Sequence, residues 1–475
     1  MMRSRGLGVG AAAIVALCSL QLASVASASQ GPLTVRPASG YHRLPLAYAG
    51  FNAPFRRNSW QARSQRLHEA VAGLAPGAIR VFGGTTANYW DWRTGKLLDE
   101  HGVPPRIRRV AREMSPIHLS DWAQLVRDAN AIPVFDLNMV TSTLSDQLAM
   151  LGAARQLGMP IRRVELGNEL YYGAPRVVGA FPTAGSYGRT ATRWIEAIKA
   201  RYPRAQIAAV GLGYPPPPGD ARQASWDRAV RRTLHGEDAL TFHAYWAASR
   251  DRSLSRAGVA EALAAPLRLL RTLRSHGLER LPKGVDAWVT EWNVWHGAGY
   301  RGTWTNGLAD AAYLLGLLGE PSVDQEDLHP LVHSQPQAAL FGNPSGFEFR
   351  GGGPPTVRYA PTAVGEALGE LYPALWGGAK VRRLDVPRSP KLGGTGIAAV
   401  RGVAVEGRGA LLVNLSGRRR QLELRAGLAC NGTLDSVWAR PSARITGRPG
   451  GVREATSPVN GSFKLPAHSV NRLSC

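Results

Sequence analysis

The chain has 475 residues, with 57 Lys and Arg against 34 Asp and Glu, and a formal net charge of +23. This length exceeds the usual size of a single core, so one large domain with a smaller companion is expected. The basic residues are scattered and no recognition motif stands out, which disfavours a nucleic-acid-binding protein, whereas the charge would suit an anionic partner.

Residues 1–28 have the order of a secretory signal peptide. A charged start is followed by an apolar run to about Val25 and then by Ala26-Ser27-Ala28. An uncleaved membrane anchor is the alternative, but the apolar run is short and rich in alanine for a spanning helix. No later apolar run approaches the length of a membrane-spanning helix. The sequence therefore predicts a secreted protein, extracellular or periplasmic, with no membrane attachment after cleavage.

Short apolar segments rich in β-formers alternate with amphipathic helical stretches over most of the chain. This alternation predicts parallel strands with crossover helices, and eight repeats would close a (β/α)8 (TIM) barrel. The predicted strands are residues 46–52, 78–82, 132–138, 163–167, 206–211, 239–245, 287–291 and 338–341. A last helix at 362–376 would complete a catalytic barrel over residues 46–376.

The character of the chain changes after Pro361. Short apolar segments separated by Gly, Pro, Asn and Arg turns predict a small antiparallel β-sandwich over residues 377–475. The N-terminal segment 29–45 is a candidate for an additional strand of that sandwich. Cys430 and Cys475 are the two cysteines left after signal removal, so we expect a disulfide between them, with two unpaired structural thiols as the alternative.

Two glutamates lie where predicted barrel strands end, and such ends carry the catalytic groups of these barrels. Glu169 closes the run Leu166-Gly167-Asn168-Glu169, and Glu291 closes the seventh strand. Cleavage of a glycosidic bond needs one protonated and one ionised carboxyl group, and these two residues would supply the pair. Taken singly, Glu169 could cap a helix and Glu291 could belong to a structural ion pair.

Other predicted strand ends also carry polar side chains. Arg80 would keep Glu291 ionised, although a buried arginine can also merely tie loops together. Tyr245 would donate a hydrogen bond to Glu291, and His243 would orient either glutamate. The remaining polar candidates, which would contact the sugar, are Asn138 and Asn168.

Aromatic residues follow several of the predicted strands, and sugars stack their C–H faces on flat rings. Trp90, Tyr171 and Trp292 are therefore predicted to bind substrate, with core packing as the alternative for each. No paired Cys/His spacing, phosphate-binding glycine loop or serine-hydrolase elbow occurs, so no metal or organic cofactor is expected.

The pairing of Leu166-Gly167-Asn168-Glu169 with Thr290-Glu291 resembles clan A of the glycoside hydrolases, the retaining (β/α)8 enzymes. Within the clan, residues 79–85, 89–92 and 465–470 resemble heparanase-like family 79, whose members carry a trailing β-sandwich. Arabinofuranosidase and xylosidase families share much of this pattern. The resemblance spans most of the mature chain.

The resemblance implies double displacement, in which Glu291 attacks and Glu169 first donates a proton and then activates water as a base. It also implies a polysaccharide or oligosaccharide substrate, with β-linked uronic acids as the class that would suit a basic protein. The alternative is a carbohydrate-binding or surface-adhesion protein on a barrel that has lost catalysis.

Overall fold

The computed structural model describes residues 31–55, 59–247, 254–295, 298–333, 337–341, 359–425, 431–445 and 451–475. The predicted signal peptide, residues 1–28, lies outside these ranges, and so does Cys430. Within them, no helix has the length and apolar character needed to cross a membrane.

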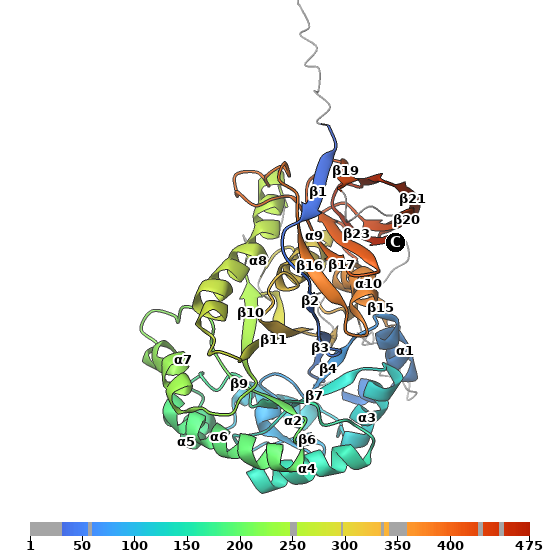
Figure 1. Cartoon of the computed structure of the whole chain (residues 1–475). Helices are drawn as coiled ribbons and strands as arrows, with labels where there is room; N and C mark the ends of the chain where they lie inside the picture. Colours follow the sequence, from blue (N-terminus) through green and yellow to red (C-terminus); the bar gives the residue numbers. More distant parts are fainter. Residues whose placement is uncertain are drawn as a thin grey trace, which may run out of the picture.

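Eight parallel strands close a barrel, which confirms the predicted fold class (Figure 1). The strands are β3 (Ala49–Ala53), β4 (Ala78–Val81), β7 (Ile132–Asp136), β8 (Arg163–Leu166), β9 (Gln206–Val210), β10 (Ala239–Trp246), β11 (Asp286–Val294) and β12 (Val323–Leu328). The barrel closes where β12 pairs with β3, with Glu326 opposite Ala49.

Helices cover the outside of the barrel. They are α1 (Gln65–Gly73), α2 (Pro105–Glu113), α3 (Leu119–Asp128), α4 (Leu144–Gln156), α5 (Pro175–Ala180), α6 (Ala184–Arg201), α7 (Ala221–Thr233), α8 (Arg256–His276), α9 (Trp304–Leu317) and α10 (Ala363–Leu375). Several begin at a side-chain cap, as where Thr183 accepts from the amide of Ser186 at the start of α6. Every residue of α9 is buried, because this helix lies between the barrel and the second domain.

The predicted eighth strand, residues 338–341, is wrong. The barrel closes through β12, and Leu340–Phe341 form β14, which joins β13 (Val332–His333) and β15 (Ala360–Pro361) in a small separate sheet. The sequence of β12 is Val-Asp-Gln-Glu-Asp-Leu, which lacks the apolar run expected of a strand buried on both faces. Glu326 and Asp327 are nevertheless buried, and Gln325 donates to Asp327 over 2.7 Å.

Asp327 links the stability of the barrel to pH. Burial, together with the charge of Glu165, raises the pKa of Asp327 to about 8. The folded chain therefore holds a proton that the unfolded chain releases near pH 4. Stability should fall as pH rises from about 4 to about 8, by about 5 kcal/mol at most from this group. In Asp327→Asn, urea unfolding at pH 5 and pH 8 should give a smaller difference than in the parent.

The exposed Asp385, which pairs with Arg36 on the surface, provides the control. Asp385→Asn should leave the pH dependence of the unfolding free energy unchanged. Other buried acids, including Glu326, also have raised pKa values because they are buried, so the slope should be reduced rather than abolished. An undiminished slope in Asp327→Asn would contradict the assignment.

The second domain is a ten-stranded sheet that combines both ends of the chain (Figure 1). Its strands are β1 (Leu33–Pro37), β2 (His42–Arg43), β16 (Lys380–Asp385), β17 (Val400–Val405), β18 (Gly409–Asn414), β19 (Arg420–Leu424), β20 (Asn431–Trp438), β21 (Arg453–Asn460), β22 (Ser462–Leu465) and β23 (Ser469–Ser474). The first strand, β1, pairs antiparallel with β16 and parallel with β19, so the domain is mixed rather than wholly antiparallel.

The β domain has two apolar sides. One set of side chains, including Leu412, Leu422 and Phe463, forms a core of its own. Another set, including Val403, Leu411 and Val470, belongs to the same cluster as the barrel core. Cys475, at the end of β23, is disulfide-bonded. Because this second set of side chains is continuous with the barrel core, apolar packing holds the β domain against the barrel.

Candidate active site

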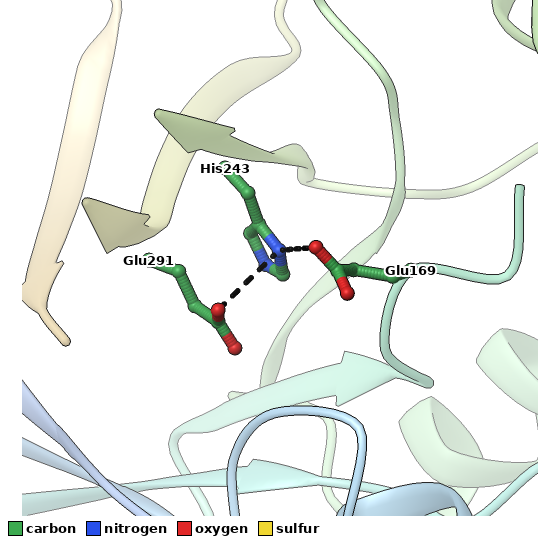
Figure 2. A group of neighbouring side chains, drawn as sticks. All are labelled: Glu169, His243 and Glu291. Carbon is green, nitrogen blue, oxygen red and sulfur yellow. Dashed lines mark hydrogen bonds and ion pairs between the residues drawn. The ribbon is translucent and has the colours of Figure 1, made fainter. Parts of the chain in front are cut away.

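Three titratable side chains meet at the carboxyl ends of the barrel strands (Figure 2). Glu169 follows β8, His243 lies on β10 and Glu291 lies on β11. The Nδ1 atom of His243 is 3.0 Å from Oε1 of Glu169 and 3.8 Å from Oε2 of Glu291. One oxygen of each glutamate and one nitrogen of the histidine all lie within 4.8 Å of one another. The structure thus brings together the two glutamates that the sequence singled out.

Glu291 is held by donors on both of its oxygens. Its Oε1 accepts from Asn52 Nδ2 at 3.0 Å and from Arg80 Nη1 at 2.9 Å, and its Oε2 accepts from the Tyr245 hydroxyl at 2.6 Å. Burial would raise the pKa of Glu291, but the positive charges of His243, His329 and Arg80 and the Tyr245 hydrogen bond hold it well below its usual range. Glu291 is therefore ionised at neutral pH.

The loop after β4 approaches this carboxylate closely. A Cβ atom on Gly84, which has φ +86°, would lie 3.2 Å from Glu291 Oε1. A Cβ atom on Gly83 would lie 2.3 Å from Asn52 Oδ1 and 2.8 Å from Arg80 Nη1. A side chain at position 83 would therefore clash with these donors, and the positive φ at position 84 favours glycine. The Gly83-Gly84 pair therefore lets the backbone close over Glu291 and its donors.

Arg80 is the centre of the buried charge network. It is 1% exposed and donates to Glu165, to Glu291 and, through Nη2, to Asp136 at 2.9 Å and Asn168 at 3.0 Å. Burial opposes its charge, but the three carboxylates outweigh burial and raise the pKa of Arg80. Burial also raises the pKa of Asp136 well above its usual range. One guanidinium thus faces three carboxyl groups.

A sharp turn after β8 presents Asn168 and Glu169. Gly167 and Glu169 both have positive φ, +86° and +49°, and the second is unusual for a glutamate. Asn88 fixes the turn, since its side chain donates to the Asn168 carbonyl at 2.8 Å and accepts from the Asn168 amide at 3.2 Å. Backbone strain of this kind persists where the surroundings determine it, as at functional sites.

The side chains on this turn keep hydrogen-bonding capacity for a ligand. Asn168 accepts from Arg80, but its buried Nδ2 has no hydrogen-bond partner among the described residues. Glu169 accepts at Oε1 from the Tyr171 hydroxyl at 3.3 Å and is paired with His243, and no described residue donates to its Oε2. Burial disfavours the charged form of His243, but the Glu291 and Glu169 carboxylates raise its pKa.

Two aromatic residues predicted to bind substrate, Trp292 and Trp90, lie in the core instead. Trp292 is fully buried, packs against Tyr313 and donates to Glu326 at 2.7 Å, so it faces the helix layer outside the barrel. Trp90 is 4% exposed, in the hairpin of β5 (Trp90–Asp91) and β6 (Lys96–Leu97), and stacks face to face on Phe82 at 4.1 Å. Both indole rings belong to the core.

Asn138 is a turn residue rather than a sugar contact. Its Nδ2 donates to the Trp90 carbonyl and to Thr141 Oγ1, and its Oδ1 accepts from the amides of Val140 and Thr141. Its side chain therefore has no hydrogen-bonding group left for substrate. Tyr171, also predicted to bind sugar, is buried and donates to Glu169.

Several site residues were not predicted from the sequence. Asn52 ends the first predicted strand and could have been found by the strand-end rule that selected Arg80. Glu165 and Asp136 lie inside the predicted strands 163–167 and 132–138, where the strand-end rule does not select them. His329, whose Nδ1 is 4.0 Å from Glu291 Oε2, directly follows β12. That strand was not predicted from the sequence, so the position of His329 at the barrel mouth could not be predicted either.

The cluster of Glu169, His243 and Glu291 has the composition of a cation site, but its electrostatics argue otherwise. Both oxygens of Glu291 already accept hydrogen bonds, and the Arg80 guanidinium lies 2.9 Å away. A cation placed there would be repelled by the Arg80 guanidinium. An ionised carboxylate facing a second carboxyl group is instead the arrangement of an acid/base and nucleophile pair.

No protein-family model matches the sequence, and no curated protein matches it either. Solved structures do resemble it. A family 51 α-L-arabinofuranosidase from Bifidobacterium longum superposes with a TM-score of 0.69 at 16% identity, covering 94% of this chain and 98% of the other. An α-L-arabinofuranosidase from Thermotoga maritima gives a TM-score of 0.63 at 16% identity, with coverage of 94% and 99%.

A 4-O-α-L-rhamnosyl-β-D-glucuronidase from Fusarium oxysporum gives a TM-score of 0.59 at 14% identity, covering 93% of this chain and 100% of that one. At these identities the likeness establishes a shared fold, which here means a (β/α)8 barrel with an attached β domain. Because nearly the whole length of each chain is covered, the β domain is part of that shared architecture.

Proposed function

We propose that this protein is a retaining glycoside hydrolase that cleaves O-glycosidic bonds of glycans. The observation that carries the proposal is the separation of the two glutamates, whose nearest oxygens lie within 4.8 Å. Retaining enzymes hold their carboxyl groups about 5 to 5.5 Å apart, whereas inverting enzymes need about 6.5 to 9.5 Å to admit a water molecule. The spacing here favours direct attack by a carboxylate.

In the proposed first step, a Glu291 oxygen attacks the anomeric carbon while the bond to the leaving oxygen breaks, and Glu169 gives that oxygen its proton. In the second step, Glu169 takes a proton from water as the water oxygen attacks the same carbon and releases Glu291. Asn52, Arg80 and Tyr245 keep the nucleophile ionised and oriented. His243 and Tyr171 position Glu169.

The substrate class is a further part of the proposal. We propose an oligosaccharide or polysaccharide containing uronic acid, as for heparanase-like enzymes, because the net charge of +23 favours an anionic glycan. The likeness to a rhamnosyl-glucuronidase is compatible with this class, and the likeness to α-L-arabinofuranosidases makes arabinosides the competing one. We also propose that the protein is secreted, on the character of residues 1–28.

The test is product release, followed by proton NMR, from uronic-acid, arabinose, xylose and glucose glycans. A first-formed product with retained anomeric configuration, absent with Glu291→Gln, supports the proposal. Release with inverted configuration would overturn the mechanism. Binding of glycans without any cleavage would favour a carbohydrate-binding protein instead.

Asn168→Ala should lower kcat/KM by about 10² on a substrate that carries a hydroxyl group next to the anomeric carbon. The reason is that the unpartnered Nδ2 of Asn168 is available to donate to that hydroxyl. The matched control is the corresponding 2-deoxy substrate, on which parent and variant should differ much less. An equal loss on both substrates would mean that Asn168 acts only through Arg80.

A further inference from the structure

A cavity lies between the barrel helices and the β domain. It has a volume of about 670 Å³ and is lined by residues of α8, α9, β1, β16 and β17. Arg274 lies in the last turn of α8, and Glu320 lies in the short connection between α9 and β12. Both positions are at the amino ends of the barrel strands, whereas the glutamates are at the carboxyl ends, so this cavity is separate from the candidate active site.

The lining of this cavity carries more positive than negative charge. Four arginines, Arg36, Arg274, Arg383 and Arg401, face two carboxylates. Asp385 forms an ion pair with Arg36 at 3.1 Å, and Glu320 accepts a hydrogen bond from Arg274 Nε at 3.1 Å. Within the described part of the chain, Arg383 and Arg401 make no ion pair. Two guanidinium groups therefore remain without a counter-ion.

Arg401 is the less exposed of these two. Its Nε atom is buried and has no hydrogen-bond partner among the described residues. Burial, reinforced by the charges of Arg383, Arg274 and Arg271, lowers the pKa of Arg401, and Glu320 only partly opposes this effect. An unpaired guanidinium that is partly withdrawn from water is destabilising unless an anion compensates it.

We propose that this cavity binds a small organic dianion carrying phosphate, sulfate or carboxylate groups. The planar guanidinium forks of Arg383 and Arg401 match the geometry of such oxyanions. Apolar side chains, including Leu270, Leu315 and Val400, line the same cavity and would cover the carbon skeleton of the ligand. A volume of this size suits a small molecule rather than a polymer. The ligand would connect the barrel to the β domain.

Calorimetric titration of the full mature chain with inorganic phosphate, sulfate and malonate tests the site, with chloride at matched ionic strength as the blank. We expect saturable binding of at least one of the three probes. Comparison of their affinities then identifies the preferred oxyanion. In Arg383→Gln and in Arg401→Met, affinity should fall at least about tenfold. Arg388→Gln, an exposed arginine of the same domain outside the cavity, should bind like the parent.

Thermal unfolding separates a binding role from a structural one. Without anion, Arg401→Met should be at least as stable as the parent, because an unpaired charge has been removed from a partly buried position. Added anion should raise the Tm of the parent but not of the variant. The proposal is overturned if no probe binds saturably at millimolar concentration, or if Arg383→Gln and Arg401→Met both bind as well as Arg388→Gln.

Discussion

Glu291→Gly should lose glycosidase activity by more than about 10⁴-fold, and azide should restore turnover of a substrate with a good leaving group. The substitution removes the attacking carboxylate and leaves a space of its size beside the anomeric carbon. Azide in that space displaces the leaving group in a single step, so the glycosyl azide should have the inverted configuration. Proton NMR of the product distinguishes the two anomers.

Glu169→Gly is the matched variant. Glu169 has φ +49°, a conformation that glycine adopts without strain, so the substitution should not damage the turn. A substrate with a good leaving group still forms the intermediate on Glu291, and azide then attacks from the opposite face, so this product should retain its configuration. Exchanged configurations would mean exchanged roles for the two glutamates. Unimpaired activity in either variant would contradict its assignment.

Arg80→Gln should lower the free energy of unfolding by about 3 to 5 kcal/mol and abolish activity. The substitution removes the guanidinium that pairs with Asp136, Glu165 and Glu291, and with it the positive charge that compensates these buried groups. The loss should be smaller at acid pH, because protonation then relieves the repulsion. Urea unfolding at pH 5 and pH 8, beside activity assays, measures both effects.

Two further arginine variants sharpen this test. Arg80→Lys keeps the charge but not the forked geometry, so it should be intermediate in stability. Arg112→Gln breaks an exposed pair with Asp99 and should cost less than about 1 kcal/mol. If Arg80→Gln were no less stable than Arg112→Gln, the network around Arg80 would not hold the barrel mouth together.

Much of the barrel could be predicted because seven of its strands are apolar and alternate with helical stretches. The eighth could not, since β12 places Gln325, Glu326 and Asp327 inside the protein. These side chains are stabilised by partners from distant parts of the chain, such as Tyr372, which donates to Glu326. No local pattern reveals such partners.

The outward position of Trp292, which we had expected to bind substrate, has a reason that the sequence does contain. Successive residues of a strand point to opposite faces, so the neighbour of an inward Glu291 must face outward. Trp292 does so. By the same rule, Tyr245 lies two residues after His243 on β10 and faces the same carboxylate. Side-chain parity separates site residues from core residues better than residue type does.

The first described strand, β1, pairs with β16 and β19. These two strands follow the barrel in the sequence, so the ribosome makes them only after the whole barrel. Leu33 lies opposite Leu422, and Arg36 lies opposite Asp385. During synthesis the edges of β1 must wait unpaired until those strands emerge. In terms of topology, the barrel is an insertion within the β domain. A fragment that stops after α10 would therefore leave β1 without the strands that it pairs with in the β domain.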